Sequence, residues 1–125
     1  MTLVRLSHRR VTMKGEHLGE FEELVLLSVR IMGDDASGAT IQEVLETDAG
    51  RPGSLGAIYA ALDRLARKGL VDSELGDPTP RRGGRRRRFY KVTSAGVSQL
   101  EASRSVRDAM WERASEASRE ERATR

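Results

Sequence analysis

Cysteine is absent from this sequence of 125 residues, proline occurs three times, and aromatic residues make up only 4%. Without cysteine the chain has no disulfide framework, no thiolate nucleophile and no cysteine-based zinc site, which fits a reducing compartment. Long apolar runs are also lacking, because the longest cluster, residues 24–27, is followed at once by Ser28. These absences predict a soluble, cytoplasmic protein that has no membrane partner.

Catalytic and metal-binding residues are scarce as well. Both histidines, His8 and His17, lie near the N-terminus and are too isolated to form a metal site. Segment 52–56, Pro-Gly-Ser-Leu-Gly, has a proline where a nucleophile elbow needs glycine. The glycines of segment 50–56 follow no apolar strand, so they form neither a phosphate loop nor a dinucleotide fingerprint. We therefore expect no enzymatic activity, no cofactor and no metal.

Charged residues are abundant and unevenly distributed. They make up 33% of the sequence, whereas the net charge is only +3. Residues 81–88 are rich in arginine and contain no acid, while acidic residues gather in 16–23, 34–48 and 112–121. A local basic cluster of this kind is typical of a surface that binds an anionic partner. With 38% hydrophobic residues the chain has room for one domain with a modest core, which a partner subunit can complete.

Two helices are expected before residue 50. Apolar spacing predicts the first over residues 18–32, closed by Gly33. Segment 37–41 opens a second, shorter helix, in which Thr40 and Glu43 have the spacing of a capping box. The residues of this helix that we expect to be buried are Ile41, Val44 and Leu45.

Residues 54–69 carry the most informative pattern. Ser54 is placed to cap a third helix and Gly69 to end it. Its apolar face is predicted to comprise Leu55, Ile58, Leu62, Leu65 and Ala66. Its exposed face is predicted to comprise Gly56, Ala57, Ala60, Arg64 and Arg67. Small residues on the exposed first half let the helix backbone approach a groove closely, which is typical of a recognition helix.

A two-stranded hairpin is expected after Gly69. Apolar and polar residues alternate in 71–75 and again in 89–92, as in half-buried strands. The segment between them holds prolines, glycines and a run of arginines, so we expect a projecting, mobile tip.

Thr93 is expected to cap a long last helix. A weak coiled-coil seam runs along it, with Trp111 beside the seam, at Leu100, Ser103, Arg107, Met110, Ala114 and Ala117. This seam cannot hold two helices together alone, so we expect the helix to pack also on the first helix, from the same or a partner subunit. The predicted dimer interface comprises Phe21, Leu24, Leu100, Arg107, Met110, Trp111 and Ala114.

The order of these elements predicts a mainly α fold with a small β-hairpin: a winged helix-turn-helix followed by a C-terminal dimerisation helix. We expect a basic flexible leader at 1–17, since this segment lacks the apolar core of a signal peptide. The winged domain is expected at 18–93, the dimerisation helix at 94–115 and a disordered tail at 116–125.

Residues 18 to about 104 resemble the PadR family of bacterial transcriptional regulators, in its smaller branch with a single C-terminal helix. The resemblance is carried by Leu-Gly-Glu-Phe-Glu-Glu-Leu-Val-Leu-Leu at 18–27, by the tyrosine, leucines and Gly-Leu of 54–71, by Arg-Gly-Gly-Arg at 82–85 and by Phe-Tyr-Lys-Val-Thr-Ser-Ala-Gly at 89–96. It implies a homodimer, held by the last helix with the first, that binds an inverted-repeat operator in double-stranded DNA and usually represses. It also implies that Tyr59 lies near the DNA backbone and that the arginines of 82–88 contact phosphates.

The predicted DNA-binding residues are Ser54, Gly56, Ala57, Tyr59, Arg64, Arg81, Arg82, Arg85, Arg86, Arg87 and Arg88. Plainer interpretations remain open for several of them. Tyr59 can be a half-buried core residue, and the arginine run can be an ordinary solvated loop. Arg64 and Arg67 can form surface ion pairs with Asp63 or Glu74 instead of reaching DNA.

Two other classes of function remain possible at this point. A winged helix can dock a protein against the small-residue face of its third helix, and Arg-Gly-Gly-Arg at 82–85 can bind RNA. Trp111 adds a ligand hypothesis: paired indoles across a two-fold axis can hold a small, flat aromatic effector. The alternative is that Trp111 only packs against the first helix.

Overall fold

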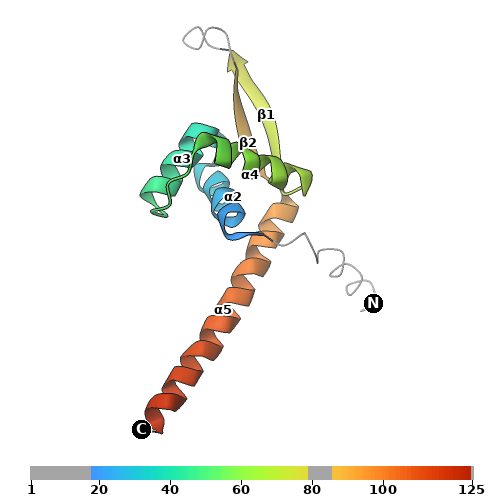
Figure 1. Cartoon of the computed structure of the whole chain (residues 1–125). Coiled ribbons are helices and arrows are strands. Elements are labelled where there is room, and N and C mark those ends of the chain that lie inside the picture. The colour runs from blue at the N-terminus through green and yellow to red at the C-terminus, as the bar shows by residue number, and fades with distance from the viewer. Residues whose placement is uncertain (1–17, 79–85, 125) are drawn as a thin grey trace, which may run out of the picture.

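A computed structural model describes residues 18–78 and 86–124 of the chain. The elements follow in the order α2 (Glu20–Met32), the 3-10 turn η1 (Gly33–Asp35), α3 (Gly38–Thr47), α4 (Leu55–Arg67), β1 (Val71–Pro78), β2 (Arg86–Val92) and α5 (Ser94–Ala123) (Figure 1). This is the predicted mainly helical fold with one small hairpin. The leader predicted at 1–17 lies outside the described residues.

Side-chain caps fix where three helices begin. Ser54 accepts a hydrogen bond from the Ala57 amide at 3.0 Å, and Thr93 accepts one from the Gly96 amide at 3.0 Å, both as predicted. The capping box predicted for α3 at Thr40 and Glu43 is wrong. Instead Ser37 caps α3, because its amide donates to Thr40 Oγ1 at 2.9 Å and its hydroxyl accepts from the Thr40 amide.

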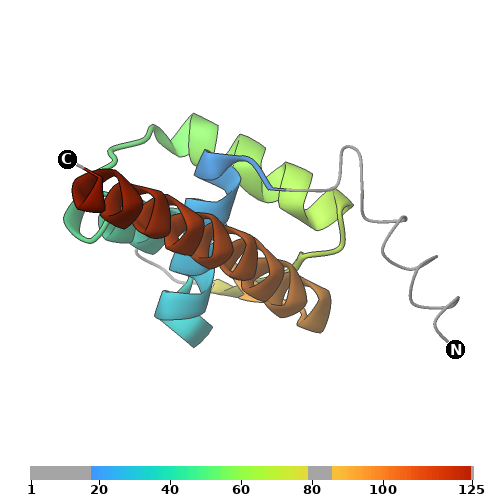
Figure 2. The same cartoon turned by 90° about the horizontal axis from the view of Figure 1, so that it is seen from below.

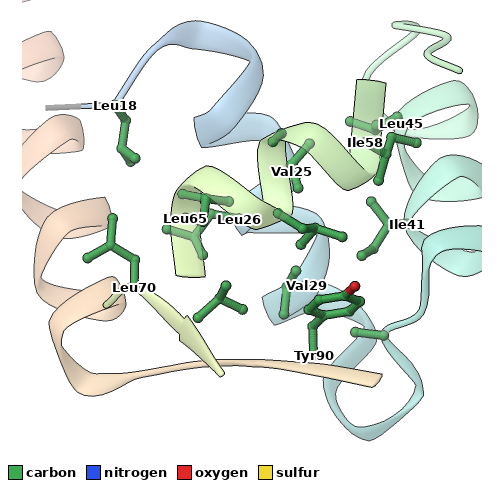
Figure 3. Close-up of a cluster of buried hydrophobic side chains, with 14 of the residues drawn as sticks. Leu18, Val25, Leu26, Val29, Ile41, Leu45, Ile58, Leu65, Leu70 and Tyr90 are labelled. Carbon is green, nitrogen blue, oxygen red and sulfur yellow. The ribbon is translucent and has the colours of Figure 1, made fainter. Parts of the chain in front are cut away.

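The core is built around α2, whose inner face is almost fully enclosed. Val25, Leu26 and Val29 are at most 1% exposed, and Figure 3 shows them between α3, α4 and β2. Burying one side chain of this size stabilises the fold by about 1.5–3 kcal/mol. The predicted buried residues of α3 are buried, with Ile41 and Leu45 at 0% and 1% exposure.

The buried face of α4 differs from the predicted one at both ends. Ile58, Leu62 and Leu65 are buried as predicted, whereas Leu55 is 41% exposed and Ala66 is also exposed. Ala61, which the predicted apolar face did not include, is buried at 0% exposure. The buried arc of α4 is centred between Ile58 and Leu65, which turns Ala61 inward and leaves the other two residues at the edge.

The hairpin is antiparallel and is tied to the helical body at its base. Its register runs from Val71 opposite Val92 to Leu75 opposite Arg88, and becomes irregular before Pro78. The Tyr90 amide donates to the Ala36 carbonyl at 2.9 Å, which joins β2 to the segment before α3. Beyond this base the hairpin projects from the body, on the opposite side from the C-terminal end of α5 (Figure 1).

Helix α5 is longer than predicted. It continues to Ala123, so the predictions that the helix ends at 115 and that 116–125 forms a disordered tail are wrong for the described residues through 124. No glycine or proline follows Gly96, and alanine, glutamate and arginine, which favour helix, dominate the end of the chain. Only Gly96 and Leu100 are buried along α5, which crosses in front of α2 in the view of Figure 2. Among the described residues, no helix combines the length and apolarity that crossing a membrane requires.

Candidate nucleic-acid interface

The outer face of α4 is smooth in its first half. Gly56, Ala57 and Ala60 are exposed, as predicted, and they follow the Ser54 cap directly. The amides at the start of a capped helix carry a partial positive charge and attract anions. This end of α4 can therefore approach a polyanion closely, with no large side chain between the backbone and the ligand.

Tyr59 lies beside the start of α3. Its side chain is close enough that a Cβ added at Gly38 would lie 2.4 Å from the Tyr59 hydroxyl oxygen, so only glycine fits there with the ring in place. Tyr59 is 46% exposed. The phenol is thus held against the first turn of α3 while part of it faces solvent.

A hollow of about 470 Å³ joins α3, α4 and the hairpin. It is lined by Ser37, Gly38, Ala39, Tyr59, Leu75, Arg86, Arg87, Arg88 and Tyr90. A helix start, a phenol hydroxyl and guanidinium groups are all hydrogen-bond donors suited to a phosphate. The sequence pattern indicated the tyrosine and the arginines separately, and the fold brings them together.

The arginines of β2 are partly anchored along the hairpin. Arg86 donates from Nε to the Gly76 carbonyl at 2.8 Å, and Arg88 donates from Nη1 to Ser73 Oγ at 3.0 Å. The Arg87 guanidinium lies 5.9 Å from the centre of the Phe89 ring. Each guanidinium has five N–H donors, so these contacts leave further donors for a ligand. The predicted contacts Arg81, Arg82 and Arg85 lie outside the described residues.

The second half of α4 carries two different ion pairs. Arg67 pairs with Asp63 at 2.8 Å, one helical turn away, and both side chains are about two-thirds exposed, at 67% and 66%. This is one of the surface pairs considered from the sequence, and such a pair adds little stability. Arg64 instead pairs with Glu22 of α2, its Nε lying 2.6 Å from Glu22 Oε2.

Sequence reasoning missed the role of Glu22, which is a buried carboxylate that receives two cations. Besides Arg64, Lys68 donates to Glu22 Oε1 at 2.8 Å. Burial opposes ionisation of Glu22, but the hydrogen bonds from Lys68 and Arg64 outweigh it and hold the pKa below its ordinary value of 4.5. The sequence carried one signal for this role: Glu22 lies three residues before Val25 and four before Leu26, which places it on the buried face of α2.

A second surface lies between α2 and α5. A groove of about 570 Å³ separates them, and Arg107 of α5 forms an ion pair with Glu23 of α2 across it. The groove is lined by Glu23, Leu27, Arg30, Val97, Leu100, Glu101, Arg104, Arg107, Asp108 and Trp111.

The predicted dimer-interface residues are divided between the core and the surface. Leu100 is only 7% exposed, and Phe21 and Leu24 pack partly against the core. The exposed members are Arg107, Met110, Trp111 and Ala114, with Trp111 at 71% exposure. Trp111 lines the groove without being covered, so in the single chain it does not pack as an ordinary core residue.

Sequence reasoning missed part of the exposed apolar surface. Leu27 and Ile31 on α2 are 38% and 59% exposed, and Val106 on α5 is 64% exposed. Periodicity indicates which apolar residues share a face of a helix, but it does not tell whether the same chain covers that face.

Comparison with known proteins identifies the family. The model of the transcriptional regulator PadR-like family matches residues 27–102. The chain belongs to this family. Comparison with the curated proteins gives no match.

Solved structures of PadR proteins share the fold. A PadR family transcriptional regulator from Eggerthella lenta is 21% identical, with a TM-score of 0.60, over 92% of this chain and 88% of that one. A PadR-like transcription factor from Bacteroides fragilis is 22% identical, with a TM-score of 0.64, over 90% and 96% of the two chains. Bacillus subtilis PadR, solved in complex with operator DNA, is 19% identical, with a TM-score of 0.58, over 66% and 45%.

Proposed function

We propose that this PadR-like chain is a sequence-specific DNA-binding transcriptional regulator that works in the cytoplasm. The observation that carries the proposal is the smooth, capped start of α4 beside the arginines of β2, with Tyr59 between them. Bacillus subtilis PadR was solved with operator DNA, and it shares this fold. The proposal assigns α4 to the major groove and the hairpin to the neighbouring backbone.

In this proposal the first half of α4 approaches the bases through its backbone. The major groove is about 12 Å wide and admits a helix. Ser54, Gly56 and Ala57 meet the DNA at the capped end, where no bulky side chain keeps the helix away. Side chains as short as alanine reach few base edges, so sequence selection rests substantially on DNA shape.

The hollow between α3, α4 and the hairpin is the proposed phosphate site. Tyr59, Arg86 and Arg88 line it together with the start of α3, so three kinds of donor, a phenol, guanidinium groups and helix amides, surround one oxygen-rich ligand. We extend the proposal to Arg87 on the same strand, and to Arg81, Arg82 and Arg85 of the hairpin tip, as further backbone or minor-groove contacts.

We propose a homodimer held by α5 and α2. Beyond Leu100, α5 buries no side chain of its own chain, although it carries Val106, Met110 and Trp111 at 64% exposure or more. A second copy would cover these residues and the exposed Leu27 and Ile31 of α2 in one two-fold contact. The groove contributes both signs of charge, with arginines and acids interspersed, so it can complement itself.

A two-fold dimer predicts a two-fold operator. Half-sites should lie about one or two turns of DNA apart in an inverted repeat. The proposed outcome of binding is repression, as the family resemblance implies.

Salt dependence tests the proposal against the other two classes. Purified protein is titrated into a labelled duplex over a range of salt concentrations. The proposal expects affinity to fall steeply with salt, because each neutralised phosphate releases counterions. A weak salt dependence would favour protein docking on α4, and a preference for single-stranded RNA would favour an RNA-binding role.

A further inference from the structure

Glu22 connects two helices through a single carboxylate. It lies in the first turn of α2, is 8% exposed, and accepts hydrogen bonds from Arg64 at 2.6 Å and Lys68 at 2.8 Å. Arg64 lies in the last turn of α4, and Lys68, four residues later, is the C-cap residue of this helix. The carboxylate therefore holds the last turn of α4 and its C-cap against α2.

The geometry of the Arg64 contact leaves part of the guanidinium available. Glu22 accepts from Nε, which is one edge of the group, and the Arg64 side chain is 45% exposed. Arginine presents five donors in a rigid fork, so a bond at Nε fixes the direction of the two Nη groups. A side chain that is already fixed loses less conformational entropy when it binds a ligand.

Arg64 also lies on the same exposed side of α4 as Ala57 and Ala60. These are the small residues that the proposed function places against DNA. A guanidinium fixed beside them is suited to a backbone phosphate that borders the groove.

We propose that Glu22 is a positioning residue for DNA binding. It holds Arg64 so that the Nη groups face a phosphate next to α4, and it does not touch DNA itself. This inference rests on the proposed function, and it adds a residue whose charge is opposite to that of the arginines in the interface.

The charge of Glu22 makes the inference sharply testable. An acid close to a phosphate repels it, so electrostatics alone predicts that removing the charge strengthens binding. Positioning predicts the opposite sign, because a released Arg64 no longer presents its donors in a fixed direction. The sign of the change in affinity separates the two accounts.

The experiment compares Glu22→Gln, Arg64→Ala and the double variant with wild type. Glu20→Gln is the matched control, since Glu20 lies in the same turn of α2, is 72% exposed at its side chain and pairs with Arg51 outside α4. The probe is a fluorescein-labelled duplex of mixed sequence, two helical turns long. Fluorescence anisotropy gives Kd over a range of salt, and circular dichroism melting confirms that each variant is folded at the assay temperature.

We expect Glu22→Gln and Arg64→Ala each to weaken binding about tenfold, the cost of one charge-assisted hydrogen bond. Each should also reduce the salt slope by about one phosphate per protomer. The double variant should be no weaker than Arg64→Ala, and Glu20→Gln should bind at least as tightly as wild type. A merely structural role of Glu22 would leave the salt slope of the folded molecules unchanged.

Three results would overturn the inference: tighter binding or a steeper salt slope for Glu22→Gln, an effect equal to that of Glu20→Gln, or no effect of Arg64→Ala. The last variant keeps the contact between Glu22 and Lys68, so it tests the inference even where Glu22→Gln folds poorly. Failure of wild type to bind any duplex would instead refute the proposed function.

Discussion

Replacing Gly38 with alanine should separate DNA affinity from stability. The added Cβ would lie 2.4 Å from the Tyr59 hydroxyl oxygen and 2.6 Å from the ring carbon that bears it, both well inside contact distance. These atoms are at the far end of a side chain that is 46% exposed, so the ring can rotate outward instead of forcing the backbone apart. Glycine to alanine within a helix gains up to about 1 kcal/mol. We therefore expect the free energy of unfolding to change by less than about 1 kcal/mol.

The same substitution should weaken DNA binding, because the displaced phenol leaves the proposed phosphate hollow. Loss of one hydrogen bond to a charged group corresponds to about a tenfold increase in Kd. Anisotropy titration gives the affinity, and thermal melting gives the stability. Gly19→Ala is the matched control, since nothing lies within 4 Å of a Cβ at Gly19.

A double-mutant cycle decides whether the effect passes through Tyr59. In a Tyr59→Ala background there is no ring to displace, so Gly38→Ala should cause no further loss of affinity. Two results would refute the reasoning. The first is that Gly38→Ala lowers the affinity equally in the wild-type and Tyr59→Ala backgrounds. The second is that Gly38→Ala binds as tightly as wild type although Tyr59→Ala binds weakly.

Three further predictions concern the core, a buried charge and the exposed face of α5. Leu26→Ala should lower the free energy of unfolding by about 2–5 kcal/mol in chemical denaturation, because Leu26 is fully buried, and a loss below 1 kcal/mol would contradict this. Since the pKa of Glu22 is lowered on folding, wild type should exceed Glu22→Gln in stability by about 1–3 kcal/mol above pH 4.5, and this difference should vanish as pH falls through the folded-state pKa; a pH-independent difference in melts would contradict it. The double variant Trp111→Ala, Met110→Ala should sediment more as a monomer than wild type, because both residues are exposed in the single chain and lie in the proposed dimer contact. Trp111 is also the proposed effector site, so the tryptophan fluorescence of wild type should change when planar aromatic compounds are added. An unchanged signal across such compounds would count against that site.

Spacing and residue type are sufficient where the structural feature is set by residues close together in the sequence. The Ser54 cap, the hairpin and the buried Ile58, Leu62 and Leu65 follow from spacing and residue type. The start of α3 did not, because Ser37 and Thr40 can both cap a helix. The choice depends on the turn before them, where Thr40 Oγ1 donates to the Asp35 carbonyl at 2.6 Å.

Contacts between helices were the part that spacing could not predict. Glu22 and Arg64 are 42 positions apart, and only the packing of α2 on α4 brings them within 2.6 Å. The sequence offers Asp63 or Glu74 as ion-pair partners for Arg64, but it does not point to Glu22, which lies on another helix. The predicted end of α5 is too early for a different reason. The prediction followed the weak apolar seam, whereas the residues after 115 have high helix propensity and continue the helix to Ala123.

Selection of DNA fragments by the purified protein tests the central claim most directly. The genome of the source organism is fragmented, fragments bound by wild type are sequenced, and the selection is repeated with Arg86, Arg87 and Arg88 changed to alanine. The account predicts that wild type enriches a two-fold symmetric duplex, and that the variant loses affinity broadly across sequences because these arginines contact phosphates. Enrichment of no double-stranded sequence, even at low salt, would contradict the assignment of this PadR-like protein to DNA recognition.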